Sequence, residues 1–148
     1  MKEEIKTVFI IILFVFIIVI PVFAPIYNNY VAKKTADNLA DIPLPENTEF
    51  VEKTYSARKL VGSGNGMQYF GAILVKSGLP LHELEEYYSG YADTEWQCIV
   101  ESQETEEIRV IEHGELEFES EVTGGGYYIV YSWGENHTIF NEFDLRGH

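Results

Sequence analysis

Hydrophobic side chains occupy every position of residues 8–20, whose sequence is VFIIILFVFIIVI. Together with residues 21–26 the uncharged stretch reaches about the 20 residues that a helix needs to cross a bilayer. The pattern therefore predicts a membrane-spanning helix or a secretory signal peptide. Cleavage after Ala24 would leave Pro25 just beyond the cut, where its ring and missing N–H fit poorly into an extended protease substrate. We therefore expect an uncleaved anchor, with a cleaved signal peptide as the alternative.

The charges on the two sides of the apolar segment do not determine the orientation of this anchor. Lys2 and Lys6 precede the apolar segment and Lys33 and Lys34 follow it, so the positive-inside rule barely discriminates. A very short tail before a first span is typical of signal anchors that export the long C-terminal part. We therefore predict a single-pass protein of the cytoplasmic membrane with an extracytoplasmic C-terminal domain. A cytosolic domain is the alternative.

A weakly amphipathic pattern with three evenly spaced alanines follows in residues 27–41 and predicts a short helical stalk. Pro43 and Pro45 then prevent the helix from continuing and favour an extended connection. The chain is thereby divided into a tail with a transmembrane helix at 1–26, a stalk and proline-rich linker at 27–44, and an acidic folded domain at 45–148.

The first half of the domain is predicted to hold two strands and a helix. Residues 48–60 and 67–75 have strand character, and the glycines of residues 62–66 supply the turn between them. A phosphate-binding loop is not indicated, because no Lys-Ser/Thr pair follows these glycines. Pro80 suits the first turn of a helix, in which a stripe at helical spacing should face the sheet: Leu81, Leu84, Tyr88 and Tyr91.

In the second half the hydrophobic period changes from helical spacing to two. Glycines 124–126 predict the turn of a hairpin, and a final apolar stretch predicts an edge strand. The predicted strands of this half are residues 96–100, 108–111, 115–122, 127–133 and 138–145. The fold class is therefore α+β: after the N-terminal transmembrane helix comes a mostly antiparallel sheet of about five to six strands, with one helix packed on a face.

Charge is distributed very unevenly over the 148 residues, whose net charge is −14. Residues 1–76 carry eight Lys or Arg and seven Asp or Glu, whereas residues 77–148 carry two and seventeen. Such an acidic half repels phosphate backbones and anionic headgroups, so nucleic acid is not expected as a partner. Solubility explains the charge most simply, and a cationic partner is the alternative.

Candidate catalytic or metal-binding groups are sparse. Cys98 is the only cysteine, which excludes an intrachain disulfide, and it shares a strand face with Trp96 and Val100 as a small buried hydrophobe. The four histidines lie far apart in sequence, and His82 has no second histidine four residues later. We therefore predict no cofactor, no metal and no catalytic residues, and expect a protein that is not an enzyme.

Alternating carboxylates and unpaired aromatics are the best candidates for partner binding. Residues 115–122 place four glutamates on one strand face in a ladder that faces solvent. In each of the two pairs of consecutive tyrosines, both side chains cannot point inward, so one member of each pair should be exposed. Exposed rings among carboxylates suit the binding of cationic peptides or sugars. The predicted partner-binding residues are Glu115, Glu117, Glu119, Glu121, Tyr87 and Tyr128.

The proline-rich stretch 42–45 ahead of the first strand, combined with the helix LHELEEYY at residues 81–88, resembles small bacterial membrane-anchored proteins of uncharacterised families. The resemblance covers the first half of the domain. It implies a location in the cell envelope and carries no activity or site residues with it.

Two functions fit these patterns. The first is a non-enzymatic interaction module, tethered by its transmembrane helix, that displays an acidic domain outside the cytoplasmic membrane to a protein or other envelope component. The second is an acidic inhibitor or immunity-type protein that neutralises a basic partner by electrostatically steered binding. A small hydrolase ranks below both, because no nucleophile or base stands out.

Overall fold

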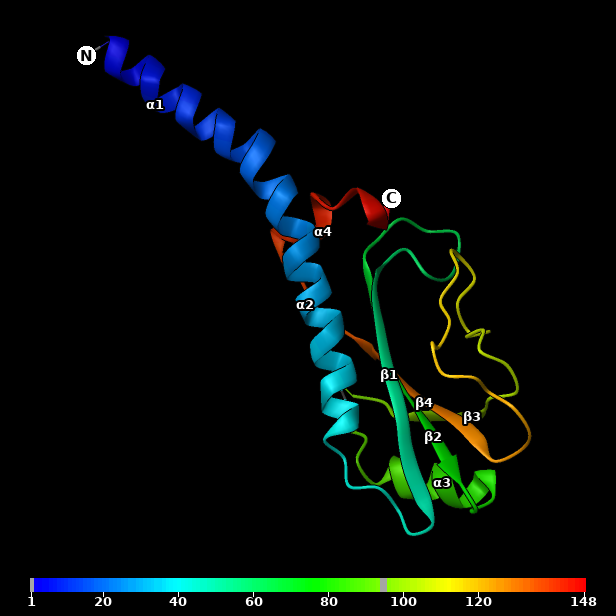
Figure 1. Ribbon diagram of the computed structural model, residues 1–148. Helices are drawn as coiled ribbons and strands as arrows, with labels where there is room; N and C mark the ends of the chain where they lie inside the picture. The colour runs from blue at the N-terminus through cyan, green and yellow to red at the C-terminus, as the bar shows by residue number, and fades with distance from the viewer. Residues whose placement is uncertain (1, 94–95) are drawn as a thin grey trace.

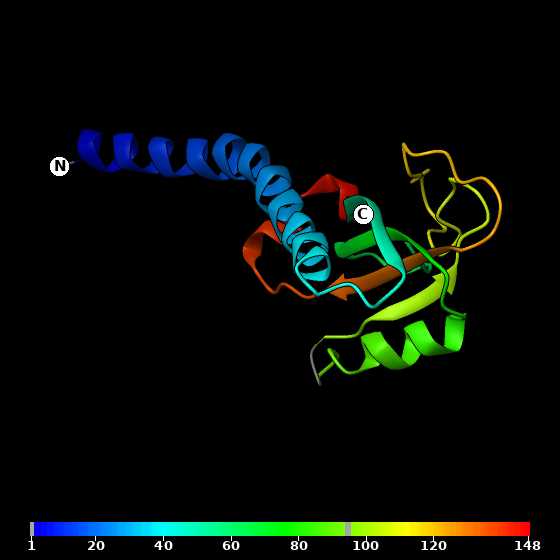
Figure 2. The same ribbon diagram turned by 60° about the horizontal axis from the view of Figure 1, so that its bottom comes forward.

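A computed structural model describes residues 2–93 and 96–148, and begins with one long helix (Figure 1). The helix consists of α1 (Lys2–Phe14), a π-helical turn at Val15–Val19, and α2 (Ile20–Ala40). Pro21 has no N–H to donate to the preceding turn. The N–H of Ile20, directly before it, bonds to the carbonyl of Val15 five residues earlier, which is the π-helical pattern. The helix bends near this turn, as Figure 2 shows.

The predicted apolar segment is confirmed as a helix. Among the described residues one helix, Glu3–Ala40, is long and apolar enough to cross a membrane, and its hydrophobic window is almost entirely uncovered by protein. These properties are compatible with a membrane anchor. The N-terminal half of the helix projects away from the rest of the chain (Figure 1).

The domain contains one antiparallel sheet of four strands in the order β1-β2-β4-β3. The strands are β1 (Thr48–Arg58), β2 (Gln68–Ser77), β3 (Ile99–Ser102) and β4 (Tyr127–Gly134). The helix α3 (Leu81–Ser89) connects β2 to β3, and its buried residues Leu84 and Tyr88 belong to the predicted stripe. The α+β class and the antiparallel sheet are thus confirmed, with fewer strands than predicted.

Two helices cover one face of the sheet. Leu39 from α2 and Leu84 from α3 pack with Ile73, Val75 and Val130 in one buried cluster. Residues 27–40 of the predicted stalk form the C-terminal part of α2, which packs against three strands of the sheet. The small side chains of Ala32 and Ala36 allow the helix to lie close to the strands, and both residues are fully buried.

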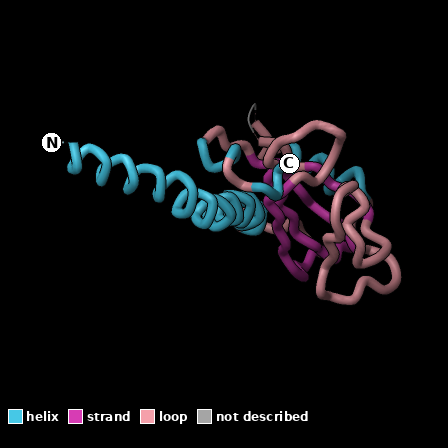
Figure 3. Tube along the Cα trace, turned by 90° about the horizontal axis from the view of Figure 1, so that it is seen from above, coloured by secondary structure: helices cyan, strands magenta, loops and turns pink. Residues whose placement is uncertain are grey.

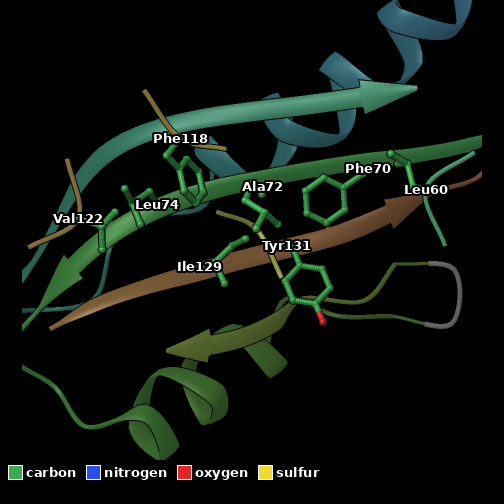
Figure 4. Packing of buried hydrophobic residues seen from close by; sticks show 9 residues of the cluster. Leu60, Phe70, Ala72, Leu74, Phe118, Val122, Ile129 and Tyr131 are labelled. Carbon is green, nitrogen blue, oxygen red and sulfur yellow. The ribbon is translucent and has the colours of Figure 1, made fainter. Parts of the chain in front are cut away.

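An irregular segment covers the other face of the sheet. Phe70, Ala72 and Leu74 of β2 point to this side, where Phe118 and Val122 close the core over them (Figure 4). Figure 3 shows the segment as a loop on the side of the sheet away from the long helix. The sheet therefore lies between a helical layer and a loop layer.

Two of the predicted strands, residues 108–111 and 115–122, lie in this loop layer and not in the sheet. The prediction for 115–122 was right about side chains: Phe118 and Val122 are buried, while the four glutamates of the ladder are exposed. It was wrong about the backbone, because the segment lies over the sheet and makes a single bridge, Glu107 to Glu117, instead of a ladder. An extended segment buries every second side chain whenever it packs against an apolar surface. The alternating pattern therefore does not by itself require pairing with a neighbouring strand.

The C-terminal edge strand predicted at 138–145 is also absent. In its place are the short helix α4 (Ile139–Glu142) and a 3-10 turn at Leu145–Gly147. The carboxylate of Asp144 accepts the backbone N–H of Arg146 and so caps the 3-10 turn, while α4 packs against α2. The hairpin turn at residues 124–126 does precede β4, but β4 pairs with β2 and β3.

Replacing Gly71 by alanine should destabilise the domain strongly. A Cβ atom there would lie 2.7 Å from the carbonyl carbon of Thr35 and 2.9 Å from Cα of Ala36, and neither backbone atom can move without displacing α2. We expect a loss of about 1–3 kcal/mol in the free energy of unfolding, as for other overpacked cores.

Denaturant unfolding of the full-length protein in detergent micelles would measure this loss. Gly125→Ala is the matched control, because a Cβ at Gly125 meets nothing within 4 Å. A Gly71→Ala variant as stable as the control would contradict the close packing of α2 on the sheet.

Candidate interaction surface

Residues 103–126, which we name the acidic loop, contain eight glutamates and one arginine. Ile108, Phe118 and Val122 bury their side chains in the core on the loop side of the sheet. These three anchors fix the loop, Val110, Ile111 and Leu116 pack partly against the same core, and the glutamates at 115, 117, 119 and 121 face solvent. The result is a fixed, strongly negative surface.

Two glutamate carboxylates, one from β1 and one from the loop itself, accept backbone N–H groups of this loop where a strand partner is missing. Glu52 of β1 accepts the N–H groups of Glu119 at 3.0 Å and Ser120 at 2.8 Å. Glu106 accepts the N–H of Val122 at 2.9 Å. Such bonds replace the ladder bonds that a strand would have made, and they leave the ladder glutamates free to point outward.

The pKa of Glu52 reports the same contacts. Burial by itself would raise this pKa, but the hydrogen bonds from Glu119 and Ser120 outweigh burial and hold it below the ordinary value of a glutamic acid. Its carboxylate is therefore ionised and accepts these bonds at neutral pH. The contribution of the Glu52 carboxylate to the stability of the fold is fully present above the pKa of a glutamate in the unfolded chain. It is lost as the pH falls through the lowered pKa that Glu52 has in the folded protein.

A β-bulge directs Glu52 toward the loop. Phe50 pairs with Val75 and Glu52 pairs with Leu74, so Val51 is an extra residue in β1. The extra residue puts Val51 and Glu52 on the same face, where Val51 packs against the core on the loop side. Nothing in the sequence around Glu52 signals this role, because it depends on the register of β1 against β2.

The predicted binding residues fall on two sides of the molecule. Glu117 and Glu119 line a groove of about 620 Å³ that also contains Lys53 and Tyr55 from β1. Glu115 and Glu121 are exposed on the same loop. Among the described residues, none of the four ladder carboxylates makes an ion pair or a side-chain hydrogen bond.

The two tyrosines lie on the opposite, helical side and have structural roles there. The hydroxyl of Tyr87 donates to the carbonyl of Pro43 at 2.7 Å, and that of Tyr128 donates to the carbonyl of Leu79 at 3.0 Å. Both side chains are half-buried. The structure thus gathers the four glutamates and does not bring Tyr87 or Tyr128 to them.

Metal-binding and nucleophilic groups remain scattered in the fold. Within residues 2–93 and 96–148, no group of three or more His, Cys, Asp or Glu side chains is placed to hold a metal ion. Cys98 is half-buried beside Trp96 and Val100, on the face that the sequence predicted, and burial raises the pKa of its thiol. His137 and His148 border a shared pocket of about 350 Å³, which sequence separation did not suggest.

A buried polar network that the sequence analysis missed connects α2 to the C-terminal residues. The amide of Asn28 donates to the Asp144 carboxylate at 2.9 Å, and the Tyr69 hydroxyl lies 2.8 Å from the Asn28 amide oxygen. Arg146 donates to Asp144 through its guanidinium at 2.7 and 2.9 Å. Burial would raise the pKa of Asp144, but the bonds from Arg146 and Asn28 hold it below the ordinary value.

Comparison with known proteins adds no relative to this description. No protein-family model, curated protein or solved structure matches the chain.

Replacing Glu52 by glutamine should release the acidic loop locally. Glutamine keeps one carbonyl oxygen but loses the charge that strengthens both bonds to Glu119 and Ser120, so these two amides should exchange hydrogen at least about tenfold faster. Amide hydrogen exchange of the full-length protein, followed by mass spectrometry, measures this. Glu49→Gln, an exposed change on the same strand, is the control. Equal exchange in both variants would show that Glu52 does not hold the loop.

Proposed function

We propose that this protein is a non-enzymatic interaction module that is tethered to the cytoplasmic membrane and binds a cationic partner through the acidic loop. The observation that carries the proposal is the arrangement of Glu115, Glu117, Glu119 and Glu121, which are exposed while the backbone beneath them is fixed by buried anchors and by Glu52. A fixed row of carboxylates loses little conformational freedom on binding, and its field steers cationic partners toward it.

The tether supports this proposal from the other end of the chain. A helix that is apolar and long enough to cross a bilayer continues without interruption into α2, which packs on the sheet. We propose that the short N-terminal tail stays in the cytoplasm and that the domain is displayed outside the membrane. The acidic loop lies on the side of the sheet away from α2 (Figure 3). In the proposed arrangement this side meets partners in the surrounding compartment.

An inhibitor or immunity-type protein is the second candidate. It is favoured by the groove beside β1, where Glu117 and Glu119 lie near Tyr55, whose side chain is 39% exposed. Carboxylates beside an aromatic ring suit the docking of a lysine or arginine side chain. The two candidates differ in what binding does: an inhibitor abolishes the activity of its basic partner, whereas a module only localises it.

Display outside the membrane can be tested with one cysteine. Gly125 is the best position in the turn before β4, because its φ is ordinary and a Cβ there meets nothing, whereas Gly124 and Gly126 have positive φ. We expect a Gly125→Cys, Cys98→Ser protein to react with a membrane-impermeant thiol reagent on intact cells. The Cys98→Ser protein is the control, and labelling only after lysis would assign the domain to the cytosol.

Binding of cations through the loop can be tested with decalysine as a defined probe. The variant E115Q/E117Q/E119Q/E121Q should bind fluorescent decalysine at least about tenfold more weakly than the unaltered protein at low salt. The matched control removes four exposed carboxylates elsewhere: E46Q/E83Q/E85Q/E86Q.

The control has the same net charge as the loop variant, so it isolates the contribution of position. We expect it to lose no more than about threefold in affinity. If both variants lose affinity equally in anisotropy titrations, net charge alone attracts the probe and the loop is not a site.

A further inference from the structure

The C-terminal residues lie beside the part of the helix that is predicted to be in the membrane. The ring of Phe143 contacts that of Phe16, with centroids 6.4 Å apart, and the ring of Phe140 contacts that of Tyr27 at 5.0 Å. Figure 1 shows α4 next to the long helix. These contacts place the rings of Phe140 and Phe143 against the helix.

Helix geometry gives the depth of that contact. Lys6 is the last charged residue before a run without charge that continues to Ala32. Phe16 is ten residues beyond Lys6, which corresponds to about 15 Å along the helix, half of a hydrocarbon core of about 30 Å. If Lys6 marks one edge of the core, the Phe143 ring that touches Phe16 lies inside the opposite edge.

The polar partners of the same segment fall at the level of that opposite edge. Arg146 donates to the carbonyl of Pro25 at 3.1 Å and to the side chain of Asn29 at 2.9 Å. By the same rise, Pro25 and Asn29 lie about 28 and 34 Å from Lys6, on the two sides of the edge at about 30 Å where headgroups replace hydrocarbon. The carbonyl of Pro25 and the charge of Arg146 thus meet in the layer that tolerates polar groups.

Ile139 and Leu145, which precede and follow Phe143 in the sequence, leave most of their surface uncovered by the protein. Ile139 is 59% exposed and Leu145 is 83% exposed. Along the neighbouring helix the side chains of Val22, Phe23 and Ile26 are also exposed. Large apolar side chains that extend an exposed membrane span into its boundary bury their surface in lipid when the span is inserted. The bilayer is the occupant that this continuity requires.

We propose that residues 139–145 are a second membrane contact, in which Ile139, Phe143 and Leu145 enter the acyl region beside the span while Arg146 stays among the headgroups. The inference rests on the membrane tether of the proposed function. Its consequence is that the domain is held at two points and cannot rotate freely about the helix, so the acidic loop keeps one orientation relative to the membrane.

Spin labels on the full-length protein in phosphatidylcholine vesicles test this contact. Single cysteines replace Ile139 and Leu145 in a Cys98→Ser background, and their collision rates with oxygen, which concentrates in hydrocarbon, are compared with those for a water-soluble nickel chelate. Phe9→Cys reports on the span itself and Gly125→Cys reports on water. We expect the ratio of oxygen to nickel collisions at 139 and 145 to exceed that at 125 roughly threefold or more.

Each other outcome overturns the proposal in a distinct way. A hydrocarbon signal at position 9 with water-like signals at 139 and 145 leaves the tether intact and removes the second contact. Labels at 139 and 145 that are shielded from both reagents show that protein, such as a second copy, covers them. A water-like signal at position 9 removes the tether and this contact together.

Discussion

The close approach of α2 to β2 is the constraint on which the rest of the structure depends. Gly71 has no side chain, and the backbone of Thr35 and Ala36 occupies the space that a Cβ would fill. Leu39 then reaches the cluster formed with α3 on the same face of the sheet. Because the helix that packs here is continuous with the apolar segment, the domain is joined to its candidate membrane anchor by a helix and not by a flexible linker.

The two faces of the sheet are covered by different means, and the second one creates the candidate interaction surface. A helix satisfies its own backbone hydrogen bonds, whereas the acidic loop needs partners for its backbone. Glu52 and Glu106 supply them, so glutamates both hold the loop and decorate it. Fixing the loop without a strand ladder leaves its ladder carboxylates exposed on one segment, where the proposed cationic partner would meet several of them at once.

The C-terminal residues connect the long apolar helix to the sheet. Asp144 is buried between Asn28 of α2 and Arg146, and Tyr69 of β2 completes the link through Asn28. A buried carboxylate that is paired and hydrogen-bonded in this way stabilises only the one arrangement that satisfies it. The network therefore orients α4 against the helix, at the level where the proposed bilayer begins.

Several features of the protein followed from the sequence alone. The apolar run at residues 8–20 determined a helix with an exposed hydrophobic surface, and the glycines at 62–66 determined the connection between β1 and β2. The spacing of Leu84 and Tyr88 determined the buried face of α3. Each of these depends on local chain geometry or on the period of burial, and both can be read from neighbouring residues.

Tertiary structure decided the rest, because local sequence allows several packing arrangements and contacts between residues distant in sequence select one of them. The alternation of residues 115–122 predicted which side chains are buried but not whether the backbone would pair, and packing over the sheet with Glu52 as partner was the outcome. Burial of Asn28 likewise depends on Asp144, more than a hundred residues away. The position of α2 on the sheet and the separation of Tyr87 and Tyr128 from the acidic loop are consequences of the same long-range contacts.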